Sequence, residues 1–144
     1  MPKIFEREIR HLEQQMTALG ARVEESVLLA VKAVRTRDLP LAARIIDDDA
    51  TVDAEEVRLE EECLKILALH QPVAVDLRMV VAILKINSDL ERVGDCAVTI
   101  AASARELCDL PEMRVPEPLD LLADSAIGML KGALDAFVRM DAAG

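Results

Sequence analysis

The sequence contains three long stretches in which apolar residues recur at helical spacing, separated only by short breaks. In the first stretch, from about Ile4 to Arg37, the interval is three or four residues, as a long helix in a bundle requires: Phe5, Ile9, Leu12, Met16, Leu19, Val23, Val27, Ala30 and Val34. The chain has no Trp or Tyr and only two Phe, so aliphatic side chains must fill the core. This composition favours interlocking helices over a β-sandwich.

Capping residues and prolines mark where these helices begin and end. Asp38 suits an N-cap, and Pro40 falls in the first turn of a second helix, where its missing N–H is harmless. Pro72 suits the start of a third helix, and a proline-rich linker precedes a fourth. We therefore expect an all-α fold. It should comprise an antiparallel three-helix bundle, the linker, and the first helix of an incomplete second repeat, at residues 1–110, 111–118 and 119–144.

The fourth helix has a broad apolar face for which one three-helix bundle offers no obvious partner. Its apolar residues are Leu119, Leu122, Ala126, Met129, Leu130, Ala133, Leu134, Phe137 and Met140. A shift of about 103 residues lays Ala30, Ala33 and Asp38 on Ala133, Ala136 and Asp141. Two readings stay open: a repeat, in which this helix begins a second three-helix unit, and chance identity between Ala-rich helices. An apolar face of this size in water drives association. We expect the helix to fold back on its own bundle or to form a homodimer, and we favour the homodimer.

Charge and hydropathy limit the partners and the compartment of this chain. The formal net charge of −10 gives no electrostatic reason to bind DNA or RNA and predicts repulsion from anionic lipid. No apolar run approaches the ~20 residues of a membrane span, and the first residues lack the apolar core of a signal peptide. The cysteines show no C-x-x-C spacing, which indicates free thiols: Cys63, Cys96 and Cys108. We expect a cytoplasmic protein that neither binds nucleic acid nor inserts into a membrane.

Several acidic residues on the second and third helices lack basic neighbours. Glu91 and Asp95 share one face of the third helix, where like charges repel by roughly 0.2–0.5 kcal/mol. They lie beside its apolar stripe, which is Met79, Ile83, Ile86, Leu90, Val93, Ala97, Ile100, Ala104 and Leu107. On the second helix, Asp49 and Glu56 occupy places in the apolar stripe, and Asp53 lies beside them. No Lys or Arg stands three or four residues from Glu91 or from the three acids of the second helix.

The hairpin of the second and third helices brings four of these acids to one level. If the chain reverses near Gln71, Asp49 and Asp53 lie about two residues, or roughly 3 Å, out of step with Glu91 and Asp95. Carboxylates suit hard cations such as Mg²⁺, Ca²⁺, Mn²⁺ or Fe³⁺, and zinc is less favoured without a His among them. A di-iron oxidase would need two Glu-x-x-His motifs on facing helices, and the sequence contains no such pair. The bland alternative is that these acids form a solvated face of an acidic chain.

Three segments around the third helix form a specific pattern. They read Gln71-Pro72-Val73-Ala74-Val75-Asp76-Leu77-Arg78, Leu84-Lys85-Ile86, and Asp89-Leu90-Glu91-Arg92-Val93-Gly94-Asp95. In order and spacing they resemble the signature of the PhoU family of phosphate-transport regulators, and the similarity runs from about Glu8 to the last residues. The resemblance implies two three-helix repeats with metal clusters held by E/D-x-x-x-D motifs. Here these motifs fall on Glu91 with Asp95 and on Asp49 with Asp53, and the metal would be Fe, Mn, Mg, Ca or Zn.

The resemblance also implies a regulatory role without catalysis: negative regulation of phosphate uptake and of the phosphate-starvation response. The implied partners are the ATPase subunit of the phosphate ABC transporter and a sensor histidine kinase. The sequence departs from the family pattern in two places. Thr99 stands where the family usually has Asn, and the second repeat stops at Gly144 before its own acidic motif. Two alternatives stay open: a carboxylate-bridged metalloenzyme and a purely structural, dimerising helical bundle.

Overall fold

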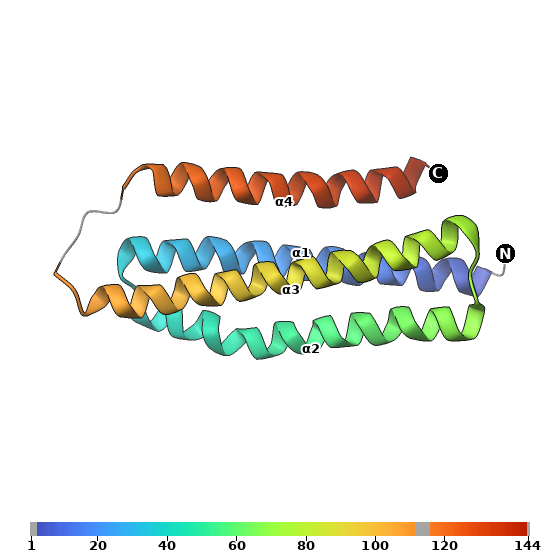
Figure 1. Ribbon diagram of the computed structural model, residues 1–144, viewed down its shortest axis with the longest axis horizontal. Coiled ribbons are helices and arrows are strands. Elements are labelled where there is room, and N and C mark those ends of the chain that lie inside the picture. The colour runs from blue at the N-terminus through green and yellow to red at the C-terminus, as the bar shows by residue number, and fades with distance from the viewer. Residues whose placement is uncertain (1–2, 112–115, 144) are drawn as a thin grey trace.

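The chain forms four long α-helices in a computed structural model that describes residues 3–111 and 116–143, and the side chains of 5–111 and 116–139 (Figure 1). The helices are α1 (Lys3–Thr36), α2 (Leu39–His70), α3 (Ala74–Cys108) and α4 (Pro118–Ala143). Within the described ranges there is no β-strand, so the predicted all-α class is confirmed. None of the described helices has an apolar stretch long enough to cross a bilayer.

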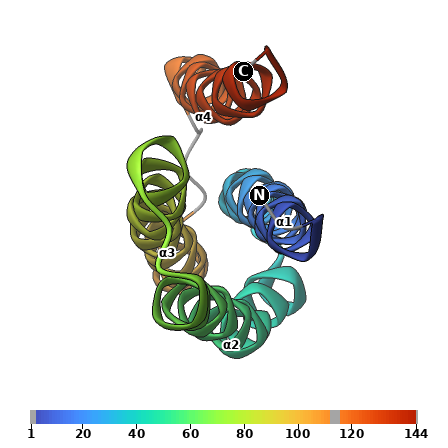
Figure 2. The same cartoon turned by 90° about the vertical axis from the view of Figure 1, so that its right-hand side faces the viewer.

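Helices α1, α2 and α3 run antiparallel in sequence order and pack pairwise on one another. Viewed end-on, α4 lies over the side between α1 and α3, across the bundle from α2 (Figure 2). The apolar stripe predicted for α1 lies in the core, where Leu12, Met16, Leu19 and Val23 are at most 2% exposed. The α-helical spacing of this stripe is therefore the main reason that the three helices associate.

The first interhelical turn follows the local chemistry of its residues. Asp38 is the N-cap of α2, and its carboxylate accepts a hydrogen bond of 3.1 Å from the main-chain N–H of Leu41. Pro40 lies in the first turn of α2, where no main-chain donor is required. Both predicted roles are confirmed.

The second turn differs from the prediction that Pro72 begins a helix. Helix α3 begins at Ala74, after an extended Val73, and both Gln71 and Ala74 have positive φ angles of 44° and 52°. Reversal of the chain therefore takes place around Pro72, which lies inside the turn. The fixed φ of proline suits a turn as well as a first helical position, so the residue type alone did not distinguish them.

The buried line of α3 is also offset from the all-apolar stripe expected for it. The buried residues are Val80, Ile83, Asn87, Leu90, Gly94, Ala97, Ala101 and Ala104. Ile86 and Val93, which the sequence placed in the stripe, are half-buried and line an apolar cavity of about 140 Å³ shared with Leu130 and Leu134 of α4. Because α3 faces α4 as well as α1 and α2, its apolar surface is wider than one buried line. Asn87 and Gly94 are among the buried residues of α3, and both lie against α2.

Helix α4 folds back on its own bundle, which was one of the two outcomes expected for it. Leu130, Leu134 and Phe137 pack against the core cluster. A Cβ added at Gly20 would lie 2.6 Å from Cδ1 of Leu134, so the absence of a side chain at Gly20 lets α4 approach α1. Other faces of α4 stay exposed, with Leu121 at 70%, Leu122 at 67% and Met129 at 76%.

Candidate metal centre

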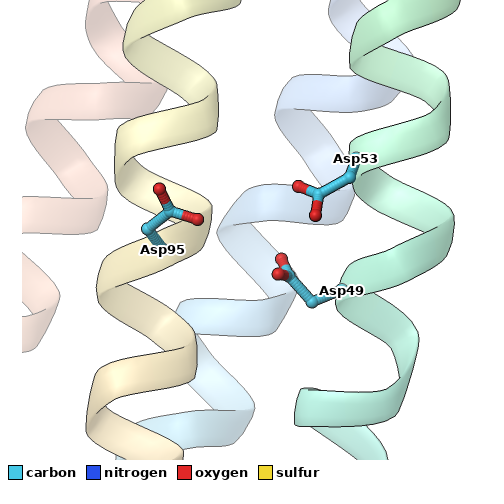
Figure 3. A group of neighbouring side chains, drawn as sticks. All are labelled: Asp49, Asp53 and Asp95. Atoms are coloured by element: carbon cyan, nitrogen blue, oxygen red, sulfur yellow. The ribbon is translucent and has the colours of Figure 1, made fainter.

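Three carboxylates meet across the gap between α2 and α3. Asp49 and Asp53, one turn apart on α2, point toward Asp95 of α3 (Figure 3). One carboxylate oxygen from each of the three lies within 4.8 Å of the others. Within the described part of the chain, none of the three forms an ion pair with Lys or Arg. This spacing would let a single cation contact both helices.

A buried hydrogen bond fixes the register that brings these acids together. The side-chain amide of Asn87 donates to the main-chain oxygen of Glu56 over 2.9 Å. Asp49 Oδ1 lies 3.9 Å from the position that a Cβ of Gly94 would occupy. This pairing lies within one residue of the register predicted from a turn near Gln71.

Glu91, the fourth predicted site residue, is not a member of the group of three. It is exposed one turn before Asp95. Its negative charge nevertheless reaches the site, because it contributes to the raised pKa values of Asp49 and Glu56. The structure thus brings together Asp49, Asp53 and Asp95, and it leaves Glu91 at the edge of the same acidic face.

The electrostatics of the site are those of crowded like charges. Partial burial is the main cause that raises the pKa of Asp49 above its ordinary value, and three neighbouring charges add to it: Asp53, Asp95 and Glu91. These neighbouring charges make ionisation of Asp49 harder. A bound cation would reverse the sign of this interaction and favour the ionised carboxylates.

Glu56 is the residue of this region that sequence reasoning left outside the predicted site. Its side chain is 4% exposed, and its Oε1 atom has no hydrogen-bond partner among the described residues. Burial, and then the surrounding acids, raise the pKa of Glu56 to about 7. The signal for it was present in the sequence, since Glu56 interrupts the apolar stripe of the second helix and has no basic neighbour.

The surroundings of the site agree with an oxygen-only ligand set. His70 lies at the end of α2, where its Nε2 atom is 2.6 Å from Glu8 and its ring packs against Phe5. The three cysteines are free, as predicted. Thr99, the departure from the family pattern, donates its hydroxyl to the main-chain oxygen of Asp95 over 3.1 Å. The residues present therefore fit a hard cation better than zinc.

Comparison with known proteins decides the family. Residues 16–104, which cover most of α1, all of α2 and nearly all of α3, match the family model described as the PhoU domain. The chain belongs to the PhoU family. The matched range contains the acidic hairpin, so the PhoU resemblance inferred from the sequence is confirmed.

Curated relatives of this PhoU chain are longer than it is. The phosphate-specific transport system accessory protein PhoU of Edwardsiella tarda is 38% identical over 137 residues, which make up 95% of this chain and 56% of the relative. The protein of the same name from Escherichia coli K12 is 37% identical over 137 residues, which make up 95% of this chain and 57% of the relative. The chain thus spans a little over half the length of these relatives.

Two solved PhoU structures have the same fold. PhoU from Pseudomonas aeruginosa superposes with a TM-score of 0.89 at 36% identity, over 96% of this chain and 66% of that one. The phosphate transport system regulatory protein PhoU from Streptococcus pneumoniae gives 0.83 at 33% identity, over 92% of this chain and 62% of that one. The similarity over more than nine-tenths of the chain includes α4 as well as the bundle.

Proposed function

We propose that this PhoU chain is a cytoplasmic regulatory adaptor that binds a metal ion on its acidic face and restrains phosphate uptake and the phosphate-starvation response. It acts by binding other proteins rather than by catalysis. Two facts support the proposal: the chain belongs to the PhoU family, and its curated relatives are named accessory proteins of phosphate-specific transport.

The observation that carries the metal-binding role is the convergence of Asp49, Asp53 and Asp95 within 4.8 Å from two different helices. Such a group is repulsive by itself, and the described residues supply no Lys or Arg ion pair to relieve it. Carboxylate oxygens would hold Mg²⁺, Ca²⁺, Mn²⁺ or an iron ion, and such an ion would tie α2 to α3. Glu91, one turn away, would add a further carboxylate at the rim.

We assign two partners to the adaptor: the ATPase subunit of the phosphate ABC transporter and the sensor histidine kinase of the phosphate response. A second copy of this chain is a third, covering the exposed apolar residues of α4, which are Leu121, Leu122 and Met129. The net charge of −10 supports protein partners over nucleic acid.

Capture of the transporter's ATPase subunit from the native cell tests the adaptor role. The tagged chain should retain that subunit, and chelator or the double substitution Asp53→Asn with Asp95→Asn should reduce the amount retained. The control is Asp47→Asn with Asp48→Asn, which removes the same charge from exposed positions of α2. Equal recovery under all conditions would contradict a metal-dependent adaptor, and no recovery at all would contradict the adaptor role.

A further inference from the structure

We propose that the carboxylate of Glu56 is an additional, inner ligand of the acidic site, and that Gly94 keeps the space between Glu56 and Asp49 open for the ion. The inference rests on the proposed metal-binding role of the acidic face. It extends that site from the surface of the hairpin into the interior of the bundle.

The first observation is the state of the Glu56 carboxylate. The residue is 4% exposed, and its buried Oε1 atom has no hydrogen-bond partner among the described residues. Buried polar atoms in folded proteins are nearly always paired, because removing them from water without a partner is costly. A buried carboxylate oxygen without a protein partner therefore needs a proton, a water or a cation.

The second observation is the location of this oxygen. A Cβ built on Gly94 would lie 3.9 Å from Glu56 Oε1 and also 3.9 Å from Asp49 Oδ1. The two oxygens thus approach one point beside the backbone of α3. Asp49 is also one of the three acids that converge between α2 and α3, together with Asp53 and Asp95. Glu56 is not itself a member of that group of three and approaches it through Asp49, so a cation beside Gly94 would have Glu56 and Asp49 on either side of it.

The surroundings give Glu56 and Gly94 no evident structural task. Asn87 donates to the main-chain oxygen of Glu56 and leaves the carboxylate unused. Within 4 Å, a Cβ at Gly94 would meet only the two carboxylate oxygens, at ordinary van der Waals distance. Alanine would therefore fit, and it would suit the interior of a helix better than glycine does. What the glycine provides is the unfilled space between the two acids.

Binding of Mn²⁺ to the full, chelator-treated chain tests this assignment, with the ion added alone and its free fraction followed by electron paramagnetic resonance. Removing a ligand should weaken Mn²⁺ binding by about tenfold or more in Glu56→Gln. Gly94→Ala should weaken it too, because the methyl group occupies the space between the two oxygens. Glu60→Gln is the matched control. It removes the same charge from an exposed position one turn further along α2 and should leave the affinity unchanged.

Asp95→Asn separates this inference from the proposed function. If Asp95→Asn loses Mn²⁺ while Glu56→Gln and Gly94→Ala bind it like the unaltered chain, the inner ligand is overturned and the surface site stands. If the unaltered chain does not bind Mn²⁺, both are overturned. Circular dichroism verifies the fold of each variant. Should Glu56→Gln fail to fold, undiminished Mn²⁺ binding by a folded Gly94→Ala would overturn the inference.

Discussion

The buried carboxyl of Glu56 links the stability of the metal-free protein to pH. Its pKa is raised from 4.5 to about 7 in the folded chain, so between these values the folded state holds a proton that the unfolded state has released. Stability from this group is therefore present at low pH and is lost as pH rises through the folded pKa. The loss is on the order of 3 kcal/mol for a shift of this size.

Replacing Glu56 by Gln should remove this pH dependence, because the amide is neutral throughout. In urea denaturation with chelator present, we expect Glu56→Gln and the unaltered chain to have similar stability at pH 5. At pH 8 the variant should be the more stable by on the order of 3 kcal/mol. Glu60→Gln, at an exposed position, serves as the control and should show no such change. A stability difference between Glu56→Gln and the unaltered chain that stays constant with pH would show that Glu56 is not protonated in the folded state.

At Glu91, removal of the side chain should separate metal binding from folding. Glu91→Ala should lower the metal content of purified protein, because a rim carboxylate is lost. It should leave the helical circular dichroism intact and stabilise the metal-free form by roughly 0.2–0.5 kcal/mol, since one like-charge pair is relieved. Mass spectrometry of bound metal beside urea denaturation measures both effects. Unchanged metal content would place Glu91 outside the site.

Single residues also show what the sequence could and could not predict about the site. The spacing of Asp49, Asp53 and Asp95 is visible in the sequence, because helical periodicity and the turn near Gln71 fix which residues oppose each other. The position of Glu56 depends on what faces it, namely Gly94 and the amide of Asn87. Which residues of α3 lie against Glu56 can be seen only in the packed structure, so the sequence alone did not predict this contact.

Between elements, the side chain of Leu134 on α4 lies directly against Gly20 of α1. The missing side chain of Gly20 makes room for Leu134, whose Cδ1 atom would lie 2.6 Å from a Cβ there. Gly20→Leu should therefore displace α4, while α1, α2 and α3 keep their mutual packing. Hydrogen exchange should then be faster for the amides of α4 and unchanged for the buried amides of α2.

Gly128 provides the matched control on α4 itself. A Cβ at Gly128 would meet nothing within 4 Å, so Gly128→Ala adds only helix propensity. It should slow hydrogen exchange of the amides of α4, because alanine stabilises a helix by about 1 kcal/mol relative to glycine. Equal exchange from α4 in Gly20→Leu and in the unaltered chain would show that α4 does not need this close approach.

Helix limits were predictable wherever local chemistry decides them, and less so where packing does. The cap at Asp38 depends on its own side chain and on the N–H of Leu41, both readable from the sequence. The start of α3 at Ala74 depends on how α2 and α3 align, which left Pro72 in the turn. The buried line of α3 also depends on packing, because Ile86 and Val93 line a cavity shared with α4 and are only half-buried.

For the whole molecule, the exposed side of α4 predicts self-association. Leu122 and Met129 are seven residues apart, on one side of the helix, and are 67% and 76% exposed. We expect a homodimer in sedimentation velocity at micromolar concentration, and we expect Leu122→Glu to shift it to monomer because a charge cannot be buried in an apolar contact without large cost.

Lys131→Glu introduces a charge change on the opposite, exposed side of α4 and serves as the control. It should leave the dimer intact. A monomer over the whole concentration range for the unaltered chain, with α4 packed on α1 as in Figure 2, would contradict the homodimer.

The distribution of the acids over two helices has a mechanical consequence. Asp49 and Asp53 belong to α2 and Asp95 to α3, so an ion held by all three would act as a removable cross-link across the hairpin. Unlike a disulfide, it would be released when the chain unfolds, so it would stabilise the folded state by an amount that depends on the ion concentration. In the folded state it would set the separation of the two helices. A change in the concentration of the ion would thereby change the separation of α2 and α3 on this face of the molecule.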